Sequence, residues 1–172
     1  MQDRDIYDQN YKHDPSNIIH ETAIICDNVI MGKNNIIGPY CVIGANGEVR
    51  GVTEFKGRVV IGNNNKISEH VTIQRPAEDA ETKVGDNNML MAHCHLGHDV
   101  IIEDNCEVCS GVIIGGYVTI KSGAKLKLGA IIRNRKTIGE NAIVGLGACV
   151  VKDVAANITV VGNPAKPLIK KI

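Results

Sequence analysis

Three histidines crowd into one short stretch of the chain, and an aspartate follows the last of them. They are His93, His95 and His98, and the aspartate is Asp99. Histidine exchanges protons near neutral pH, and a neighbouring carboxylate can fix its tautomer and raise its basicity. His98 and Asp99 are therefore candidates for a general base and the carboxylate that orients it.

The same histidines allow two other interpretations. Three imidazoles gathered between the subunits of a trimer can hold a zinc ion, and His70, His93 and His98 are the candidates for such a site. Alternatively, these polar side chains simply occupy outward positions and do no chemistry. A His-Asp dipeptide alone does not decide among the three.

A six-residue repeat of aliphatic residues must position these side chains. Between Val84 and Val150 every sixth residue is Val, Leu or Ile, and a similar series runs from Ile19 to Ile73. Neither the helix period nor the strand period gives this spacing, whereas hexapeptide β-helices do. The pattern predicts an all-β solenoid of about seven coils, with three hexapeptides per coil and parallel strands roughly 4.8 Å apart.

The other positions of the hexapeptide support this architecture. Glycine is frequent directly after the aliphatic residue, where the chain must bend. The fifth position takes small apolar residues, and Cys41, Cys94 and Cys106 share it. Because free cysteine packs as a small hydrophobe, we interpret the six cysteines as structural and expect neither disulfides nor a zinc site.

The repeat is interrupted at two places, where we expect segments outside the regular coil. Residues 74–83 break the phase, are polar and form an external loop in this interpretation. Val49 and Phe55 keep the six-residue count, but residues 48–56 make a poor hexapeptide, so an irregular excursion is expected there. Loops on a rigid scaffold often carry function.

These interruptions and the two ends give the expected organisation of the chain. Residues 1–17 form a polar N-terminal segment, residues 18–162 the β-helix, and residues 163–172 a short cap or tail.

Composition excludes several classes of protein. The chain has 172 residues, with 19 Lys plus Arg and 19 Asp plus Glu, so no overall basic charge favours nucleic acid. No apolar stretch of about 20 residues is present, and the N-terminus has no apolar signal region. These features predict a cytoplasmic protein without a membrane span.

Several motifs resemble the hexapeptide-repeat acyltransferases, in particular the UDP-N-acetylglucosamine acyltransferases of lipid A biosynthesis and short nucleotide-sugar acyltransferases. The matching stretches are 47–49, 60–62, 69–75, 82–85 and, most specifically, the run from Leu90 to Asp99. The resemblance implies a left-handed coil, against the usual right-handed crossover rule. It also implies a homotrimer that acts in lipid A or cell-surface polysaccharide synthesis.

The resemblance also implies roles for individual residues. His98 would take the proton from a sugar hydroxyl or amine, Asp99 would orient it, and the Gly116 amide would lie at the oxyanion. Glu54, Lys56, His95 and Tyr117 would contact a nucleotide-linked sugar, although the family has His where this chain has Tyr117.

The implied donor is an acyl thioester of coenzyme A or of acyl carrier protein, with no bound cofactor or metal. Residues 145–154 and 160–166 resemble the ending of acetyl-CoA-dependent hexapeptide acetyltransferases, where this stretch lines the pantetheine groove. Arg133, Arg135, Gly147 and Lys152 are the candidate donor-binding residues.

Two other functions fit the same architecture. A γ-type carbonic anhydrase would need three histidines converging on a metal ion across a trimer interface, and the His expected two coils upstream is missing. A non-catalytic trimeric scaffold would release no thiol from any acyl donor.

Overall fold

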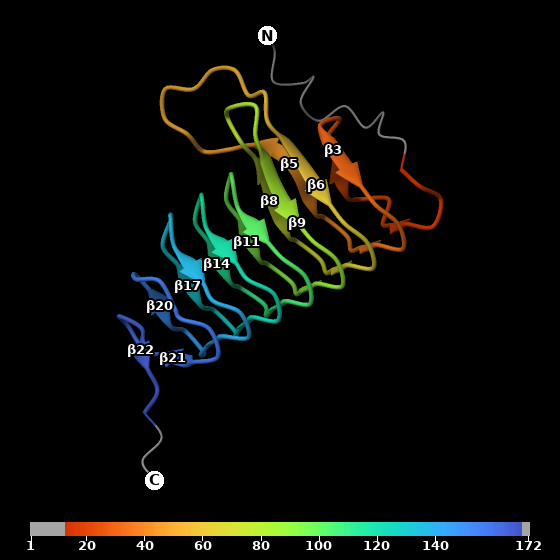
Figure 1. The fold of residues 1–172 in the computed structure, drawn as a ribbon. Coiled ribbons are helices and arrows are strands. Elements are labelled where there is room, and N and C mark those ends of the chain that lie inside the picture. Colours follow the sequence, from red (N-terminus) through yellow and green to blue (C-terminus); the bar gives the residue numbers. More distant parts are fainter. Residues whose placement is uncertain (1–12, 170–172) are drawn as a thin grey trace.

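The computed structural model describes residues 13–169, which wind into a parallel β-helix without α-helices (Figure 1). From β1 to β20, each strand pairs in parallel with the strand three places along the chain, so three sheets run along the molecule. We call them sheets A, B and C. Sheet A contains β1 (Ile18–Ile19), β4 (Ile36–Ile37), β7 (Lys66–Ile67), β10 (Met89–Leu90), β13 (Glu107–Val108), β16 (Lys125–Leu126), β19 (Ile143–Val144), β21 (Thr159–Val161) and β22 (Lys166–Pro167).

The other two sheets have the same construction. Sheet B contains β2 (Ile24–Ile25), β5 (Val42–Asn46), β8 (Thr72–Arg75), β11 (His95–Leu96), β14 (Ile113–Ile114), β17 (Ile131–Ile132) and β20 (Cys149–Val150). Sheet C contains β3 (Val29–Met31), β6 (Arg58–Ile61), β9 (Glu81–Val84), β12 (Ile101–Ile102), β15 (Thr119–Ile120) and β18 (Thr137–Ile138).

The number of coils agrees with the prediction from the repeat. Strands β1 to β18 complete six coils, and β19, β20 and the bridge between Ile138 and Val154 make a seventh within residues 13–169.

The core consists of the repeated aliphatic side chains, as the sequence predicts. Leu90, Leu96 and Ile102, one from each sheet of a single coil, are fully buried. Cys94 and Cys106 fill corners of the core as free thiols, and burial raises the pKa of each to about 11. These thiols therefore stay protonated and serve as packing groups.

One corner of the first coils is filled differently from the expectation. At the fifth position of the hexapeptide, directly before several strands of sheet A, the structure buries asparagines instead of small apolar residues. Asn65 Nδ2 donates to Asn35 Oδ1 (3.0 Å), and Asn35 Nδ2 donates to Asn17 Oδ1 (3.1 Å). This ladder satisfies the side-chain amides of Asn17, Asn35 and Asn65. It ends at Asn88, whose Oδ1 accepts the Cys106 N–H and whose Nδ2 has no partner among residues 13–169.

Residues with a left-handed backbone recur at the corners of the coil. We call the corners AB, BC and CA after the sheets that they connect. At the CA corner this residue is usually asparagine, which tolerates positive φ. At the BC corner it is Asp99 (φ 59°), Tyr117 (φ 61°) and Arg135 (φ 60°), so these three side chains stand at equivalent positions of successive coils.

Two loops leave the BC corner and project from the same side of the β-helix (Figure 1). Loop 47–57 connects β5 to β6, and loop 76–80 connects β8 to β9. The second loop is shorter than the predicted 74–83, because the residues at both of its ends pair with β5 and β6. Val49 and Phe55 keep the six-residue count by coincidence, since both lie in loop 47–57 and in no strand.

The two loops pack on each other. The Lys56 N–H donates to the Ala77 carbonyl oxygen over 3.0 Å. A β-carbon added to Gly57 would lie 2.7 Å from atoms of Pro76 and from the Glu78 carbonyl oxygen, so only glycine permits this approach. The loops therefore form one paired projection.

At the C-terminal end, β21 and β22 form an antiparallel hairpin across a cis Asn163–Pro164 bond. Residues 163–169, which belong to the predicted cap or tail, supply the turn and the second strand of this hairpin, and residues 170–172 lie outside the described residues. Most of the predicted N-terminal segment, residues 1–12, lies outside the described residues. Within residues 13–169, no helix has the length and apolarity needed to cross a lipid bilayer.

Candidate active site

His98 and Asp99 form a hydrogen-bonded pair at the BC corner that follows β11. His98 Nδ1 lies 2.7 Å from Asp99 Oδ2, and the two side chains are 17% and 15% exposed. The Asp99 backbone N–H donates to the buried Thr82 Oγ1 over 2.9 Å, which anchors the corner to sheet C. Because Nδ1–H of the neutral imidazole donates to the carboxylate, the Nε2 lone pair remains available to accept a proton.

Two glycines leave room for the imidazole. A β-carbon at Gly116 would lie 2.7 Å from His98 Nε2, and a β-carbon at Gly47 would lie 2.8 Å from the His98 β-carbon. Such distances are too short for any side chain larger than glycine. Loop 47–57 therefore begins directly against His98, and Nε2 points to the space above Gly116.

The Gly116 amide is free to donate near Nε2. At the CA corner the corresponding amides are capped, since the Asn63 N–H donates to Asp86 Oδ1 and the Asp86 N–H donates to Asp104 Oδ1, both over 2.7 Å. The Gly116 N–H has no acceptor among residues 13–169. A backbone donor without an internal partner beside a base is the arrangement that stabilises a developing oxyanion.

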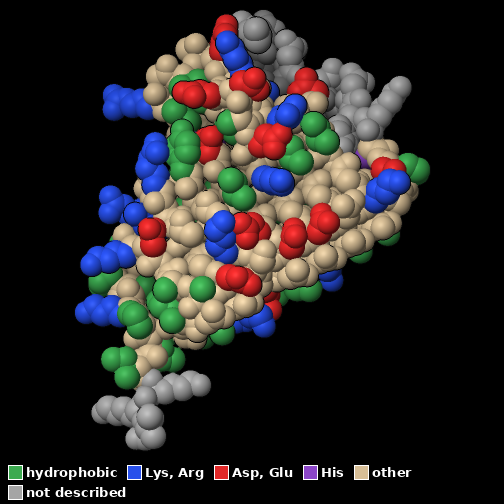
Figure 2. Space-filling view, viewed as in Figure 1, with side chains coloured by type: hydrophobic (Ala, Val, Ile, Leu, Met, Phe, Trp, Pro, Cys, Tyr) green, Lys and Arg blue, Asp and Glu red, His purple; other side chains and the backbone are tan. Residues whose placement is uncertain are grey.

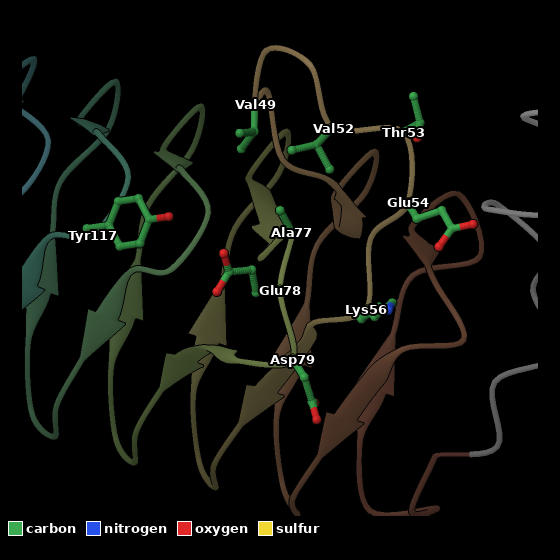
Figure 3. Close-up of a pocket in the computed structure, with 9 residues that line it drawn as sticks. All are labelled: Val49, Val52, Thr53, Glu54, Lys56, Ala77, Glu78, Asp79 and Tyr117. Atoms are coloured by element: carbon green, nitrogen blue, oxygen red, sulfur yellow. The ribbon is translucent and has the colours of Figure 1, made fainter.

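A hollow of about 600 Å³ lies between the paired loops and the β-helix (Figure 3). The loops contribute most of its lining, and Tyr117 is the lining residue that comes from the β-helix itself. The Tyr117 ring is perpendicular to the His98 ring at a centroid distance of 5.0 Å. The lining residues are Val49, Val52, Thr53, Glu54, Lys56, Ala77, Glu78, Asp79 and Tyr117.

The structure thus brings together most of the residues that the sequence proposes for the acceptor. Glu54, Lys56 and Tyr117 share the hollow, and Tyr117 connects it to His98. Glu78 and Asp79 were not predicted as site residues, although they belong to the segment where the repeat breaks phase.

His95 lies apart from this hollow, on the outer face of sheet B. Its Nδ1 is 2.8 Å from Thr72 Oγ1, and burial lowers the pKa of its imidazole while the nearby Glu48 carboxylate acts in the opposite direction. His95 is therefore held neutral at physiological pH and in one orientation. Thr72 and Glu48 lie in the stretches 69–75 and 47–49 that resemble the family, but the sequence predicts no individual role for either residue.

The candidate donor-binding residues do not form one patch within a single chain. Arg133, Arg135 and Lys152 are exposed and follow strands of sheet B, so they belong to the BC corner. Gly147 precedes β20 and lies at the AB corner, at the opposite end of that strand. Arg135 also contacts a ring, because its Cζ lies 4.1 Å from the centroid of Tyr117.

The outer face of sheet B differs in charge from the other two. In each strand of sheet B, one outward-facing residue pairs in register with its equivalent in the next coil, and we call this row the outer column. The outer column of sheet B contains no Lys, Arg, Asp or Glu. At equivalent positions sheet A has Lys66, Glu107 and Lys125, and sheet C has Lys83. The column on sheet B contains Ile24, Val42, Thr72, His95, Ile113, Ile131 and Cys149.

Among the described side chains of one chain, no group of three His, Cys, Asp or Glu is arranged to hold a metal ion.

Comparison with known proteins agrees with this architecture. Residues 81–116, which include His98, Asp99 and Gly116, match the family model described as bacterial transferase hexapeptide (six repeats). The chain is 32% identical over 185 residues to the acyl-acyl-carrier-protein–UDP-N-acetylglucosamine O-acyltransferase of Stutzerimonas stutzeri strain A1501. That match covers 89% of this chain and 72% of the relative.

A second relative of the same name, from Pseudomonas paraeruginosa strain PA7, is 38% identical over 118 residues, or 66% of this chain and 46% of the relative. The match thus spans about half the length of this relative. A solved UDP-N-acetylglucosamine acyltransferase from Bacteroides fragilis 9343 superposes with a TM-score of 0.86 at 28% identity, covering 89% of this chain and 60% of that one. These neighbours confirm the left-handed parallel β-helix.

Proposed function

Because the chain belongs to the hexapeptide-repeat acyltransferases, in the group of the UDP-N-acetylglucosamine O-acyltransferases, we propose that it transfers an acyl group from a thioester to a nucleotide-linked sugar. The observation that carries the proposal is the position of His98. Its free Nε2 lies beside an unpaired backbone N–H, and its ring contacts the tyrosine that lines the hollow. A base, an oxyanion donor and a substrate cavity are thereby adjacent.

The proposed reaction follows from this geometry. Nε2 of His98 takes the proton from the acceptor hydroxyl or amine as its oxygen or nitrogen attacks the thioester carbonyl carbon. Negative charge develops on the carbonyl oxygen and is stabilised by the Gly116 N–H. The carbon–sulfur bond then breaks, and the leaving thiolate recovers the proton from the imidazolium. Asp99 keeps the imidazole in the required tautomer and stabilises its charged form.

The hollow is the proposed acceptor site. Carboxylates of Glu54, Glu78 and Asp79 can accept hydrogen bonds from sugar hydroxyls, and Lys56 supplies a positive charge for a phosphate. The names of the relatives point to a UDP-linked N-acetylglucosamine as the acceptor.

The proposed donor side lies along the BC corner beyond His98. Arg133 and Lys152 extend from this corner into solvent, and Figure 2 shows Lys and Arg side chains projecting one below another along the left edge of the molecule. Such an edge suits an anionic donor, either the phosphates of coenzyme A or an acidic carrier protein. The names of the relatives favour acyl carrier protein. The resemblance of residues 145–154 and 160–166 to acetyl-CoA-dependent acetyltransferases favours coenzyme A.

We also propose that the active unit is a homotrimer assembled through sheet B. Its uncharged outer column leaves Ile113 and Ile131 nearly half exposed, at 46% and 45%. An apolar face of this kind is typical of subunit interfaces. Burying it would place His95 inside the assembly and the BC corner with His98 at the boundary between two subunits.

Placing a charge on this face should dissociate the trimer. We expect Ile131→Asp to give a monomer in size-exclusion chromatography with light scattering, because an unpaired buried carboxylate costs several kcal/mol. Lys125→Asp is the matched control, since residue 125 occupies the outer face of sheet A in the same coil. A trimeric Ile131→Asp protein, or a monomeric wild type, would refute assembly through sheet B.

A thiol-release screen tests the function itself. Acyl-CoAs and acyl-acyl carrier proteins of several chain lengths are each combined with a panel of nucleotide sugars, and free thiol is measured over time. We expect release that requires both a donor and an acceptor, and the preferred donor identifies the carrier. If no pair releases thiol above the rate without protein, the protein is not an acyltransferase of this kind.

A further inference from the structure

Arg135 contacts the acceptor side of the site, although its charge and position at the BC corner first assign it to the donor. Its guanidinium carbon lies 4.1 Å from the centroid of the Tyr117 ring, within the range of a cation–π interaction. The same tyrosine ring is perpendicular to the His98 ring at 5.0 Å. Tyr117 is thus in contact with a cation on one neighbouring coil and with the candidate base on the other.

The backbone fixes this order of side chains. The Tyr117 N–H donates to the His98 carbonyl oxygen over 3.0 Å, and the Arg135 N–H donates to the Gly116 carbonyl oxygen over 2.9 Å. Tyr117 and Arg135 both adopt the left-handed conformation, at φ 61° and 60°. This conformation costs a non-glycine residue on the order of 1 kcal/mol. It recurs at the corners of the β-helix, so it places Tyr117 and Arg135 at equivalent positions of neighbouring coils.

Tyr117 differs from the other residues that line the hollow in the part of the structure to which it belongs. The other lining residues belong to the loops 47–57 and 76–80, whereas Tyr117 belongs to the rigid β-helix (Figure 3). Through its ring contact, Tyr117 therefore links the lining of the hollow to His98. Tyr117 is 43% exposed and its hydroxyl has no hydrogen-bond partner among residues 13–169, so the contacts of its ring with His98 and Arg135 are what hold it.

We propose that Arg135 is a positioning residue for the acceptor: its guanidinium holds the Tyr117 ring against His98 and so sets the alignment of the acceptor with the base. The inference rests on the proposed function and deepens it, because it assigns Arg135 to the acceptor and leaves Arg133 to the donor. Small displacements of a positioned substrate have large effects on rate, so the loss of this contact is measurable in turnover.

The first test compares two neighbouring arginines. Arg135→Gln should lower kcat/KM for the acceptor about 3- to 10-fold, the scale of one cation–π contact, without changing the KM for the donor. Arg135→Lys keeps the cation and should restore part of the loss. Arg133→Gln is the matched control, since Arg133 is also exposed and lies two residues away, and it should act on the donor KM only. A rise in donor KM in Arg135→Gln at unchanged acceptor kcat/KM would overturn the proposal.

A double-mutant cycle shows whether Arg135 acts through the tyrosine. Tyr117→Leu removes the ring, and Arg135→Gln should then have no further effect on acceptor kcat/KM in this background. If the two effects multiply instead, Arg135 acts independently of Tyr117 and the proposal fails.

A second readout needs no turnover and separates this inference from the proposed function. NMR shifts of the His98 ring protons, assigned with His98→Asn, report the ring current of Tyr117. We expect Arg135→Gln and Tyr117→Leu to move these signals in the same direction while Arg133→Gln leaves them in place. Unchanged His98 signals in Arg135→Gln would overturn the inference even in an active enzyme. The expected shifts would show that Arg135 holds the Tyr117 ring against His98 even if the proposed function failed and no substrate pair were turned over.

Discussion

His98→Ala should lower the rate of acyl transfer by at least about 100-fold, the usual scale for the loss of a general base. The physical reason is that no other group can take the acceptor proton at that place: Nε2 is the free nitrogen above Gly116, and Nδ1 is engaged with Asp99 at 2.7 Å. The measurement is the steady-state rate of thiol release at saturating donor and acceptor.

The matched control for this variant is His20→Ala. His20 is exposed in the first coil and bonds Thr22, so its loss should leave the rate and the assembly unchanged. His98→Ala must also keep the oligomeric state and the thermal midpoint of the wild type, since its side chain adds little to the core. A correctly assembled His98→Ala protein with the wild-type rate would exclude His98 as the base.

Gly116→Ala should lower the rate by about 100- to 1000-fold, the scale seen when an oxyanion contact is lost. The added β-carbon would lie 2.7 Å from His98 Nε2 and Cε1, so the imidazole must move away from the acceptor. The same methyl group would occupy the space next to the Gly116 N–H. Because the clash is with a side chain, the fold accommodates it, and we expect the thermal midpoint to change little.

The double variant with His98→Ala and Gly116→Ala shows which effect of the added methyl group lowers the rate. If the alanine at position 116 acts by displacing the imidazole, Gly116→Ala should cost little in the His98→Ala background. A full additional loss in the double variant would mean that the methyl group blocks the oxyanion or the substrate instead. Wild-type activity in the single variant would remove Gly116 from the site.

The repeat predicts the fold because each hexapeptide makes the same contacts. An inward aliphatic residue such as Leu96 meets its equivalents in the neighbouring coils, Ile73 and Ile114, so six-residue spacing alone places it in the core. The same regularity places His98, Gly116 and Tyr117 at one corner, which is why much of the candidate site can be read from spacing.

The contacts that cannot be predicted from the sequence are those between the two loops and those that depend on side-chain conformation. Glu78 and Asp79 reach the hollow only because loop 76–80 pairs with loop 47–57, and no repeat specifies that pairing. The contact of Arg135 with Tyr117 depends on side-chain conformations. The buried Asn35 and Asn65 escaped prediction because asparagine at a turn is usually exposed, whereas here each amide finds a partner in the next coil.

The most direct test of the central claim is the mass of the product. We predict that wild-type protein, incubated with its preferred acyl thioester and nucleotide sugar, forms a nucleotide sugar heavier by one acyl group, in equal amount to the thiol released, and that His98→Ala forms almost none. Thiol release without an acylated sugar, or an acylated sugar that forms equally well with His98→Ala, would contradict it.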